Sequence, residues 1–150
     1  MRAPRLDAGF EETVVVQGAV DLAGVLPEGT TLIENHAWAD GQATSLRVGV
    51  DHARRVGHDA VVVGLGDQPM VPAEAWRLVG AAEAPIAVAS FGGRHRPPTR
   101  LAPETWDALP ARGDEGARAL MRLRPELVVA VPCPGEPADI DTVEDLRRWS

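Results

Sequence analysis

The sequence predicts an α/β fold of the doubly wound, Rossmann-like kind, with helices on both faces of a mostly parallel sheet. Short β-branched runs alternate with helical stretches along the chain, a pattern typical of βαβ units. The run at 60–65, Ala-Val-Val-Val-Gly-Leu, is continuous and apolar, as expected for a strand that is covered on both faces. No repeat or linker interrupts the pattern, so residues 1–150 are expected to form a single domain.

The remaining elements follow from the same patterns. Further strands are predicted at 13–17, 31–34, 85–89 and 127–131, and helices at 44–55, 72–82, 103–109, 115–123 and 142–149. Gly57 should end the first helix, and Pro72 should begin the second, because proline is tolerated in a first helical turn. Ligands of such sheets bind beyond the carboxyl ends of the strands, so the loops after residues 16, 65 and 131 are the first candidates for a site.

Composition excludes several classes of function. The net charge of −7 argues against a general nucleic-acid surface. No run reaches the ~18 apolar residues of a membrane helix, and no signal-peptide core is visible, so a cytoplasmic location is expected. All 15 basic residues are arginines, which excludes chemistry that depends on a lysine of this chain. Cys133 is the only cysteine, so neither an intrachain disulfide nor a cysteine metal cage can form.

The first polar motif lies directly after the run at 60–65 and reads Gly64-Leu-Gly66-Asp67-Gln68-Pro69. A carboxylate at the end of a central strand can hold Mg²⁺, which prefers a few carboxylates together with substrate phosphates and water. The two glycines would keep the approach free of side chains. In the alternative interpretation, Asp67 only caps the helix that follows, and the residues alone leave both open.

Two further segments precede predicted helices. Gly41 permits a close backbone approach at a helix N-terminus, which attracts anions, whereas capping by Thr44 or Ser45 explains the same residues without a ligand. Asp139 and Asp141 can supply a metal ligand and a cap. Taken alone, each segment is better explained by capping.

A cationic segment carries Arg94, Arg96 and Arg100 together with His95. As a loop, it could clamp an anionic substrate, since arginine makes bidentate contacts with phosphate. A solvated loop without a ligand is the other interpretation.

Five segments, taken in order, resemble the MobA-like nucleotidyltransferase family, and within it the molybdenum cofactor cytidylyltransferase branch. They are Val-Val-Val-Gln-Gly (14–18), the stretch from Asn35 to Leu46, Leu-Gly-Asp-Gln-Pro (65–69), Gly-Asp-Glu-Gly-Ala-Arg (113–118) and Asp-Ile-Asp-Thr-Val-Glu-Asp-Leu (139–146). The resemblance implies a sheet of the nucleotide-diphospho-sugar transferase type. It also implies a Mg²⁺-dependent transfer of a nucleoside monophosphate, CMP from CTP, onto the phosphate of a molybdopterin-type acceptor, with release of pyrophosphate.

The resemblance assigns a role to each candidate residue. The catalytic residues would be Asp67, Asp139 and Asp141, with Asp67 and Asp139 as metal ligands. The nucleotide-binding residues would be Gly41, Ser45, Gly66 and Gln68, and the acceptor side would be lined by Asp114 and Gly116. The anion-clamp interpretation of the cationic segment adds Arg94 and Arg100 to the acceptor-binding residues. Because the acceptor phosphate is already ionised, alignment and charge neutralisation by Mg²⁺ would suffice for catalysis.

The chain departs from the family at its start. The family begins with a strand, a lysine-containing phosphate loop and a helix, and the resemblance therefore implies that this chain lacks most of these parts and is inactive. The missing strand lies mid-sheet in the family. The chain is therefore expected to be marginally stable, to self-associate through unpaired edges of strands 13–17 and 60–65, or to pair these two strands directly. A structure should show either a groove or a direct ladder between them.

Two other functions remain open. A non-catalytic protein could bind or deliver the molybdenum cofactor with the same surface. A relative of the sugar-nucleotide pyrophosphorylases is disfavoured by Gly-Asp-Gln-Pro at 66–69.

Overall fold

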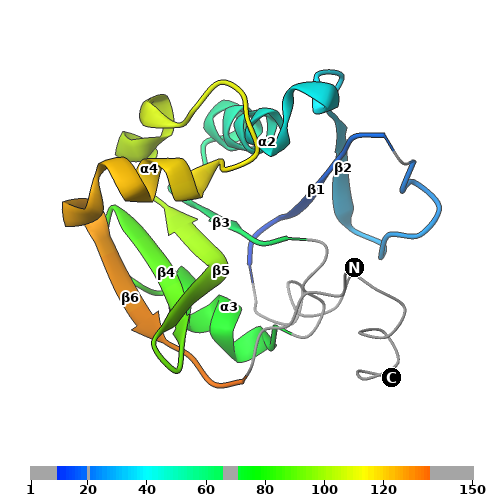
Figure 1. Ribbon diagram of the computed structural model, residues 1–150. Helices are drawn as coiled ribbons and strands as arrows, with labels where there is room; N and C mark the ends of the chain where they lie inside the picture. The colour runs from blue at the N-terminus through cyan, green and yellow to red at the C-terminus, as the bar shows by residue number, and fades with distance from the viewer. Residues whose placement is uncertain (1–9, 20, 66–70, 136–150) are drawn as a thin grey trace, which may run out of the picture.

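The computed structural model describes residues 10–19, 21–65 and 71–135 (Figure 1). The strands are β1 (Thr13–Gln17), β2 (Thr30–Glu34), β3 (Val61–Val63), β4 (Ile86–Phe91), β5 (Arg94–Leu101) and β6 (Val128–Pro132). The α-helices are α2 (Gln42–Val56), α3 (Ala73–Gly80) and α4 (Ala117–Leu123), with short 3-10 helices at Trp38–Asp40, Pro103–Ala108 and Pro125–Leu127. None of the helices in these ranges combines the length and the apolar character of a membrane span.

The strands form two sheets. β1 and β2 pair in parallel, from Thr13 opposite Thr30 to Gln17 opposite Glu34. The second sheet has the order β3-β5-β4-β6, with β4 parallel to β6 and β5 antiparallel to both β3 and β4. β3, β4 and β6 therefore run the same way, and the prediction of a mostly parallel α/β sheet is confirmed.

Helices cover both faces of the four-stranded sheet (Figure 1). On one face, residues of α2 and α4 form a buried cluster with the sheet: Val50, Ala53, Ile86, Leu101, Leu120. On the other face, α3 packs against β4 in a second cluster that includes Ala75, Val79, Ala87, Ala89. This two-sided burial explains why β4 carries apolar residues at successive positions, since neither face meets water.

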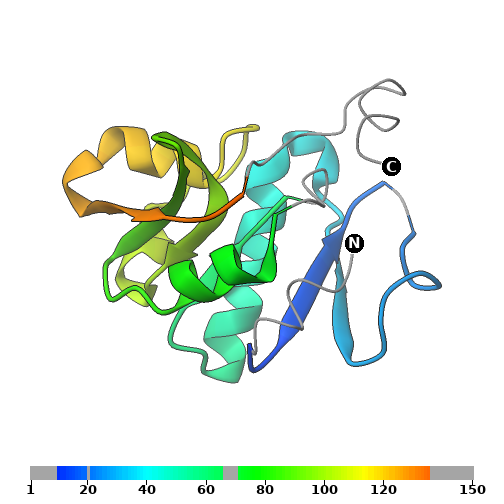
Figure 2. The same cartoon turned by 90° about the horizontal axis from the view of Figure 1, so that it is seen from below.

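The helix α2 connects the two sheets, because it follows β2, precedes β3, and contacts both β1 and β3 (Figure 2). It ends as predicted at Gly57, whose φ of 87° lies in the left-handed region and whose N–H donates to the carbonyl of Ala53. Since α2 carries the chain back from the end of β2 to the start of β3, β3 runs in the same direction as β1 and β2.

The segment predicted as a cationic loop is the strand β5, so that prediction is wrong. The sequence did not indicate a strand here, because the segment is rich in arginine and because Pro97 and Pro98 cannot donate backbone hydrogen bonds to a ladder. The pairing with β4 shifts between Val88 and Ala89, where Val88 lies opposite Thr99 and Ala89 opposite Arg96. This bulge accommodates the two prolines between paired positions.

The expected gap between β1 and β3 is present. The two strands are in different sheets and form no ladder with each other. Instead, Val14–Val16 and Val61–Val63 line one groove of about 1530 Å³, which we call the β1–β3 groove. Helices pack on both faces of β3, as predicted, with Val61 and Val63 beside the cluster of α2 and Val62 beside that of α3. The strand is nevertheless only half-buried, because it lies at the edge of its sheet among the described strands.

Candidate functional site

The N-terminus of α2 and the loop at 113–116 come together at the site. Gly41 precedes the helix with a φ of 113°, and a side chain there would collide with the backbone of Gly113. The N–H of Ala43 donates to the carbonyl of Gly113 at 2.8 Å, and the N–H of Gly113 donates to the carbonyl of Asp40 at 2.9 Å. Two segments far apart in the sequence are thus joined through glycines, which alone allow this approach.

The loop at 113–116 lies over the first turn of α2. The N–H of Gln42 faces Asp114 Oδ1 at 3.4 Å, a long contact that places a carboxylate beside the positive end of the helix. Gly116 packs against Leu46, whose Cδ2 lies 3.4 Å from where a Cβ of Gly116 would be. The structure therefore brings the predicted acceptor residues Asp114 and Gly116 next to the predicted nucleotide residues Gly41 and Ser45.

Asn35 organises the hydroxyl groups at this helix end. It is 3% exposed, and its Nδ2 donates to both Thr44 Oγ1 and Ser45 Oγ at 2.8 Å. Thr44 Oγ1 donates back to the carbonyl of Gly41 at 2.6 Å. Gly41 is the N-cap and has no side chain with which to cap the helix, so the expectation of capping by Thr44 or Ser45 is wrong. Sequence reasoning did not assign a role to Asn35, although it is the first residue of the matching segment 35–46.

The two arginines predicted to clamp an acceptor lie apart. Arg94 is opposite Phe91 and exposed, whereas Arg100 is opposite Ala87 near the other end of β5. Six residues of strand separate their backbones by roughly 20 Å. Arg100 Nη1 donates to the carbonyl of Ala84 at 3.1 Å, so its guanidinium is already engaged. The prediction that Arg94 and Arg100 together clamp the acceptor is therefore wrong.

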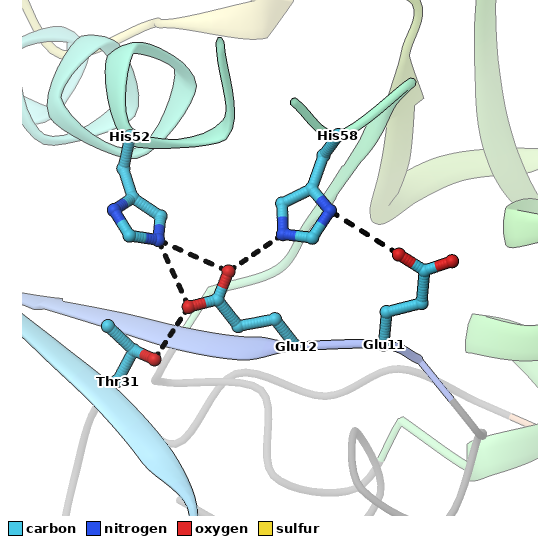
Figure 3. Close-up of polar contacts among 5 residues, drawn as sticks. All are labelled: Glu11, Glu12, Thr31, His52 and His58. Atoms are coloured by element: carbon cyan, nitrogen blue, oxygen red, sulfur yellow. Dashed lines mark hydrogen bonds and ion pairs between the residues drawn. The ribbon is translucent and has the colours of Figure 1, made fainter. Parts of the chain in front are cut away.

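A second polar cluster, missed by sequence reasoning, lies at the start of β1 (Figure 3). Glu12 accepts hydrogen bonds from His52 Nε2 at 3.0 Å, from His58 Nε2 at 2.7 Å and from Thr31 Oγ1 at 2.7 Å. Glu11 Oε2 lies 3.5 Å from His58 Nδ1. These contacts lower the pKa of Glu12 to about 2, with the Thr31 hydroxyl as the largest cause and His58 next.

His52 and His58 are half-buried rather than ordinary surface residues, with 13% and 26% of their side chains exposed. The signal that could have revealed the cluster is topological. A helix that returns antiparallel to β1 brings its C-terminal end next to the start of that strand.

Residues from both polar clusters line the β1–β3 groove. Its lining includes Ser45, Asp114 and Gly116 near the N-terminus of α2, and Glu12 and His52 at the far end of that helix. Arg100 also lines it, whereas Arg94 does not. The groove therefore runs along α2 and joins the two polar clusters.

The remaining candidates, Gly66, Asp67, Gln68, Asp139 and Asp141, lie outside the described residues. Within the described ranges, no group of three or more histidine, cysteine, aspartate or glutamate side chains could hold a metal ion. The described residues thus build no metal site by themselves. The assignment of Asp67 and Asp139 as metal ligands stays a prediction.

Two curated proteins resemble the chain in sequence. Purine catabolism protein PucB of Bacillus subtilis is 36% identical over 110 residues, which cover 70% of this chain and 54% of that protein. Nicotine blue oxidoreductase of Paenarthrobacter nicotinovorans is 32% identical over 159 aligned positions, which cover 95% of this chain and 77% of that protein. The chain therefore spans about half the length of PucB and about three quarters of the second relative.

Solved structures share the fold. Rv0371c from Mycobacterium tuberculosis superposes with a TM-score of 0.79 at 23% identity, covering 97% of this chain and 80% of that one. A complex of Rv0371c with manganese gives 0.74 at 26% identity, covering 97% and 83%. A nucleotidyl transferase from Methanothermobacter gives 0.77 at 22% identity, covering 97% and 74%.

A sequence model of the MobA-like NTP transferase domain matches residues 3–130, most of the chain. This match agrees with the α/β fold, with the two relatives and with the segments that meet at the N-terminus of α2. The chain therefore belongs to the family of MobA-like NTP transferase domains.

Proposed function

We propose that the chain is the core of a nucleotidyltransferase that transfers CMP from CTP to a molybdopterin-type acceptor and releases pyrophosphate. One observation carries the proposal. Ser45, predicted on the nucleotide side, and Asp114 and Gly116, predicted on the acceptor side, line the same groove although about seventy residues separate them. Family membership supplies the reaction class.

The hydrogen bonds suggest how the described residues would divide the work. The N–H groups of Gln42 and Ala43 already face Asp114 and Gly113, so Gly41 acts by permitting this packing rather than by binding a phosphate. Ser45 Oγ accepts from Asn35. Its own proton is therefore directed away from Asn35 and can be donated to an oxygen of the nucleotide.

Asp114 suits a different partner. A carboxylate only accepts hydrogen bonds and repels phosphate, so it favours a ligand with N–H donors. The amino and ring N–H groups of a pterin meet this requirement. Asp114 would thus orient the acceptor while Ser45 orients the nucleotide.

Transfer between phosphates requires neutralisation of their charge, which a divalent cation supplies when bound. A similar solved structure is a complex with manganese. We propose Mg²⁺ for this chain, held by Asp67 and Asp139. The described residues would orient the two substrates for the transfer.

Binding measurements test the proposal without requiring turnover. Calorimetric titration of the 150-residue chain with CTP should give saturable binding, and Ser45→Ala should weaken it about five- to tenfold through the loss of one hydrogen bond to a charged group. Ser90→Ala, the same change outside the groove, is the matched control and should leave CTP affinity unaltered. No CTP binding, or equal effects of the two variants, would overturn the proposal.

Turnover is a separate question. The chain contains no lysine and no family-type phosphate loop, and preorganised phosphate contacts are a large part of catalysis. We therefore expect no pyrophosphate release above background from the 150-residue chain with CTP, Mg²⁺ and molybdopterin.

A second reaction class follows from one comparison. The relative that aligns with 95% of this chain is named an oxidoreductase, and such enzymes commonly transfer hydride from a nicotinamide dinucleotide. The same titration with NADPH in place of CTP distinguishes the two. Tighter binding of NADPH, weakened by Ser45→Ala, would assign the groove to a redox cofactor instead.

A further inference from the structure

The side-chain amide of Asn35 is held in one orientation. Asn35 directly follows β2 and is 3% exposed. The N–H of Ala37 donates to Asn35 Oδ1 at 3.0 Å, and since a backbone N–H can only donate, the oxygen of the amide must lie on this side. The NH₂ group therefore faces two hydroxyls of α2, Thr44 Oγ1 and Ser45 Oγ, each at 2.8 Å.

The backbone of Asn35 is fixed as well. Its N–H donates to the carbonyl of Gln17 at 2.8 Å, which continues the pairing of β2 with β1 by one residue. Turning the side-chain amide over would place its oxygen against hydroxyl oxygens and its NH₂ group against a backbone N–H, which leaves buried polar groups without partners. Asn35 can therefore determine how the hydroxyls that it contacts are oriented.

The two hydroxyls have different surroundings. Thr44 is 9% exposed, and its Oγ1 donates to the carbonyl of Gly41 at 2.6 Å. Ser45 is half-buried and lines the β1–β3 groove, whereas Asn35 and Thr44 are not among the described residues that line it. Of the three side chains, that of Ser45 is therefore the one placed to meet a ligand in the groove.

The proton of Ser45 has little use inside the helix. A serine hydroxyl in a helix commonly donates to the carbonyl four residues earlier, which for Ser45 is that of Gly41. This carbonyl already accepts from the N–H of Thr44 at 3.1 Å and from Thr44 Oγ1. Since Asn35 donates to Ser45 Oγ, the Ser45 proton is also directed away from Asn35.

From this network we propose that Asn35 is a positioning residue for nucleotide binding. Its NH₂ group holds Ser45 Oγ as an acceptor, so that the Ser45 proton is available to an oxygen of the nucleotide. Asn35 acts through Ser45 and does not touch the nucleotide itself. The inference rests on the proposed function and adds to it the residue that prepares the site before the ligand binds.

Asn35→Asp reverses this hydrogen bond with almost no change of shape. A carboxylate only accepts, so the Ser45 hydroxyl must donate to it and present a lone pair to the nucleotide. Calorimetric titration at pH 7 should show CTP binding at least about fivefold weaker than for the unaltered chain. The helix α2 should be retained, because a negative charge near a helix N-terminus is favourable.

The pH dependence of the same variant separates positioning from packing. As the pH is lowered, a protonated carboxyl group at position 35 can donate again, so the CTP affinity of Asn35→Asp should recover toward that of the unaltered chain at the same pH. Loss of packing around Asn35 would give a difference that does not depend on pH.

Two further variants separate positioning from effects of charge and helix structure. In a chain that already carries Ser45→Ala, Asn35→Asp should change CTP affinity by less than about twofold, because the residue through which Asn35 acts is absent. Thr44→Val removes the other hydroxyl that Asn35 contacts and keeps the side-chain shape. It should lower the midpoint of thermal unfolding and leave CTP affinity within about twofold.

The outcomes distinguish this inference from the proposed function. Unchanged CTP affinity of Asn35→Asp, an effect of equal size with and without Ser45→Ala, a loss that does not depend on pH, or an equal loss in Thr44→Val would overturn the role of Asn35 and leave the proposed function standing. Absence of CTP binding by the unaltered chain would overturn the proposed function and this inference with it.

Discussion

Glu12 Oε1 and His58 Nε2 lie 2.7 Å apart, and this hydrogen bond joins the start of β1 to the turn that precedes β3. The contact connects two sheets that share no ladder. Glu12 also accepts a hydrogen bond from His52 of α2. It therefore holds the start of β1 through polar contacts, whereas Phe10 holds the same end by packing against Trp76 of α3. The distance between the walls of the groove therefore depends on an ionised carboxylate.

Stability should fall in acid because of Glu12. Its pKa is lowered from 4.5 to about 2 in the folded protein, so its contribution is fully present above pH 4.5 and is lost as the pH falls through about 2. One pKa unit corresponds to about 1.4 kcal/mol. Partial exposure reduces the effect, and we expect a loss of about 1–2 kcal/mol in the free energy of unfolding.

Urea denaturation at a series of pH values between 6 and 2 measures this loss. Glu12→Gln should be destabilised at pH 6 and should show a smaller decrease toward low pH than the unaltered chain. Glu83→Gln removes an exposed carboxyl group as the control and should retain the original pH profile. Parallel profiles for Glu12→Gln and the unaltered chain would contradict the prediction.

Gly64→Ala should destabilise the protein by about 1–3 kcal/mol. A Cβ at position 64 would collide with the indole ring of Trp76, which is 8% exposed and packed in the α3 cluster. Gly24→Ala is the matched control, since a Cβ there meets no atom within 4 Å, and should change stability by no more than about 0.5 kcal/mol. Chemical unfolding followed by tryptophan fluorescence compares the two, and equal values would contradict the assigned contact.

Local sequence signals predicted most of the fold. β1 and the end of α2 at Gly57 are as predicted, because a β-branched run and a glycine stop act on neighbouring residues. β5 was missed because its arginines and Pro97-Pro98 oppose strand propensity, and the bulge that accommodates them depends on β4. The valines of β3 indicate a strand in apolar surroundings, but their sequence does not indicate which strands or helices lie next to it.

The site was only partly predictable, for a similar reason. Motif order suggested that Ser45 and Asp114 belong to one site, and the structure brings them to one groove. Arg94 and Arg100 are close in sequence, but they lie near opposite ends of an extended strand, whereas a loop could have brought their side chains together. Glu12 and His58 have no recognisable spacing, because only the packing of α2 beside β1 makes them neighbours.

Gly41→Ala should cost more stability than Gly113→Ala, although both residues have a positive φ, 113° and 103°. A non-glycine residue in that region costs about 1–2 kcal/mol. At position 41 the new Cβ also collides with the Gly113 backbone, whereas at position 113 it meets nothing within 4 Å. We expect about 1–2 kcal/mol for Gly113→Ala and about 2–4 kcal/mol for Gly41→Ala in equilibrium unfolding. Equal losses would show that the loop at 113–116 can move away from α2.

The last prediction concerns Asp67 and Asp139, which the family resemblance assigns to one divalent cation. If both carboxylates bind the same ion, Asp67→Asn and Asp139→Asn should each weaken Mn²⁺ binding at least about tenfold, since even residues that only orient metal ligands cost 10- to 100-fold. Electron paramagnetic resonance of free Mn²⁺ measures this affinity without turnover. Asp51→Asn, on the exposed side of α2, is the control and should leave the affinity unchanged.

The double variant decides whether the ion is shared. Two residues that act on one ion are coupled, so the double variant should weaken binding by clearly less than the product of the two single effects. Independent sites would give the full product. Binding that survives in either single variant would remove that residue from the metal site, whereas equal loss in Asp51→Asn would show that the titration reports general acidity rather than coordination.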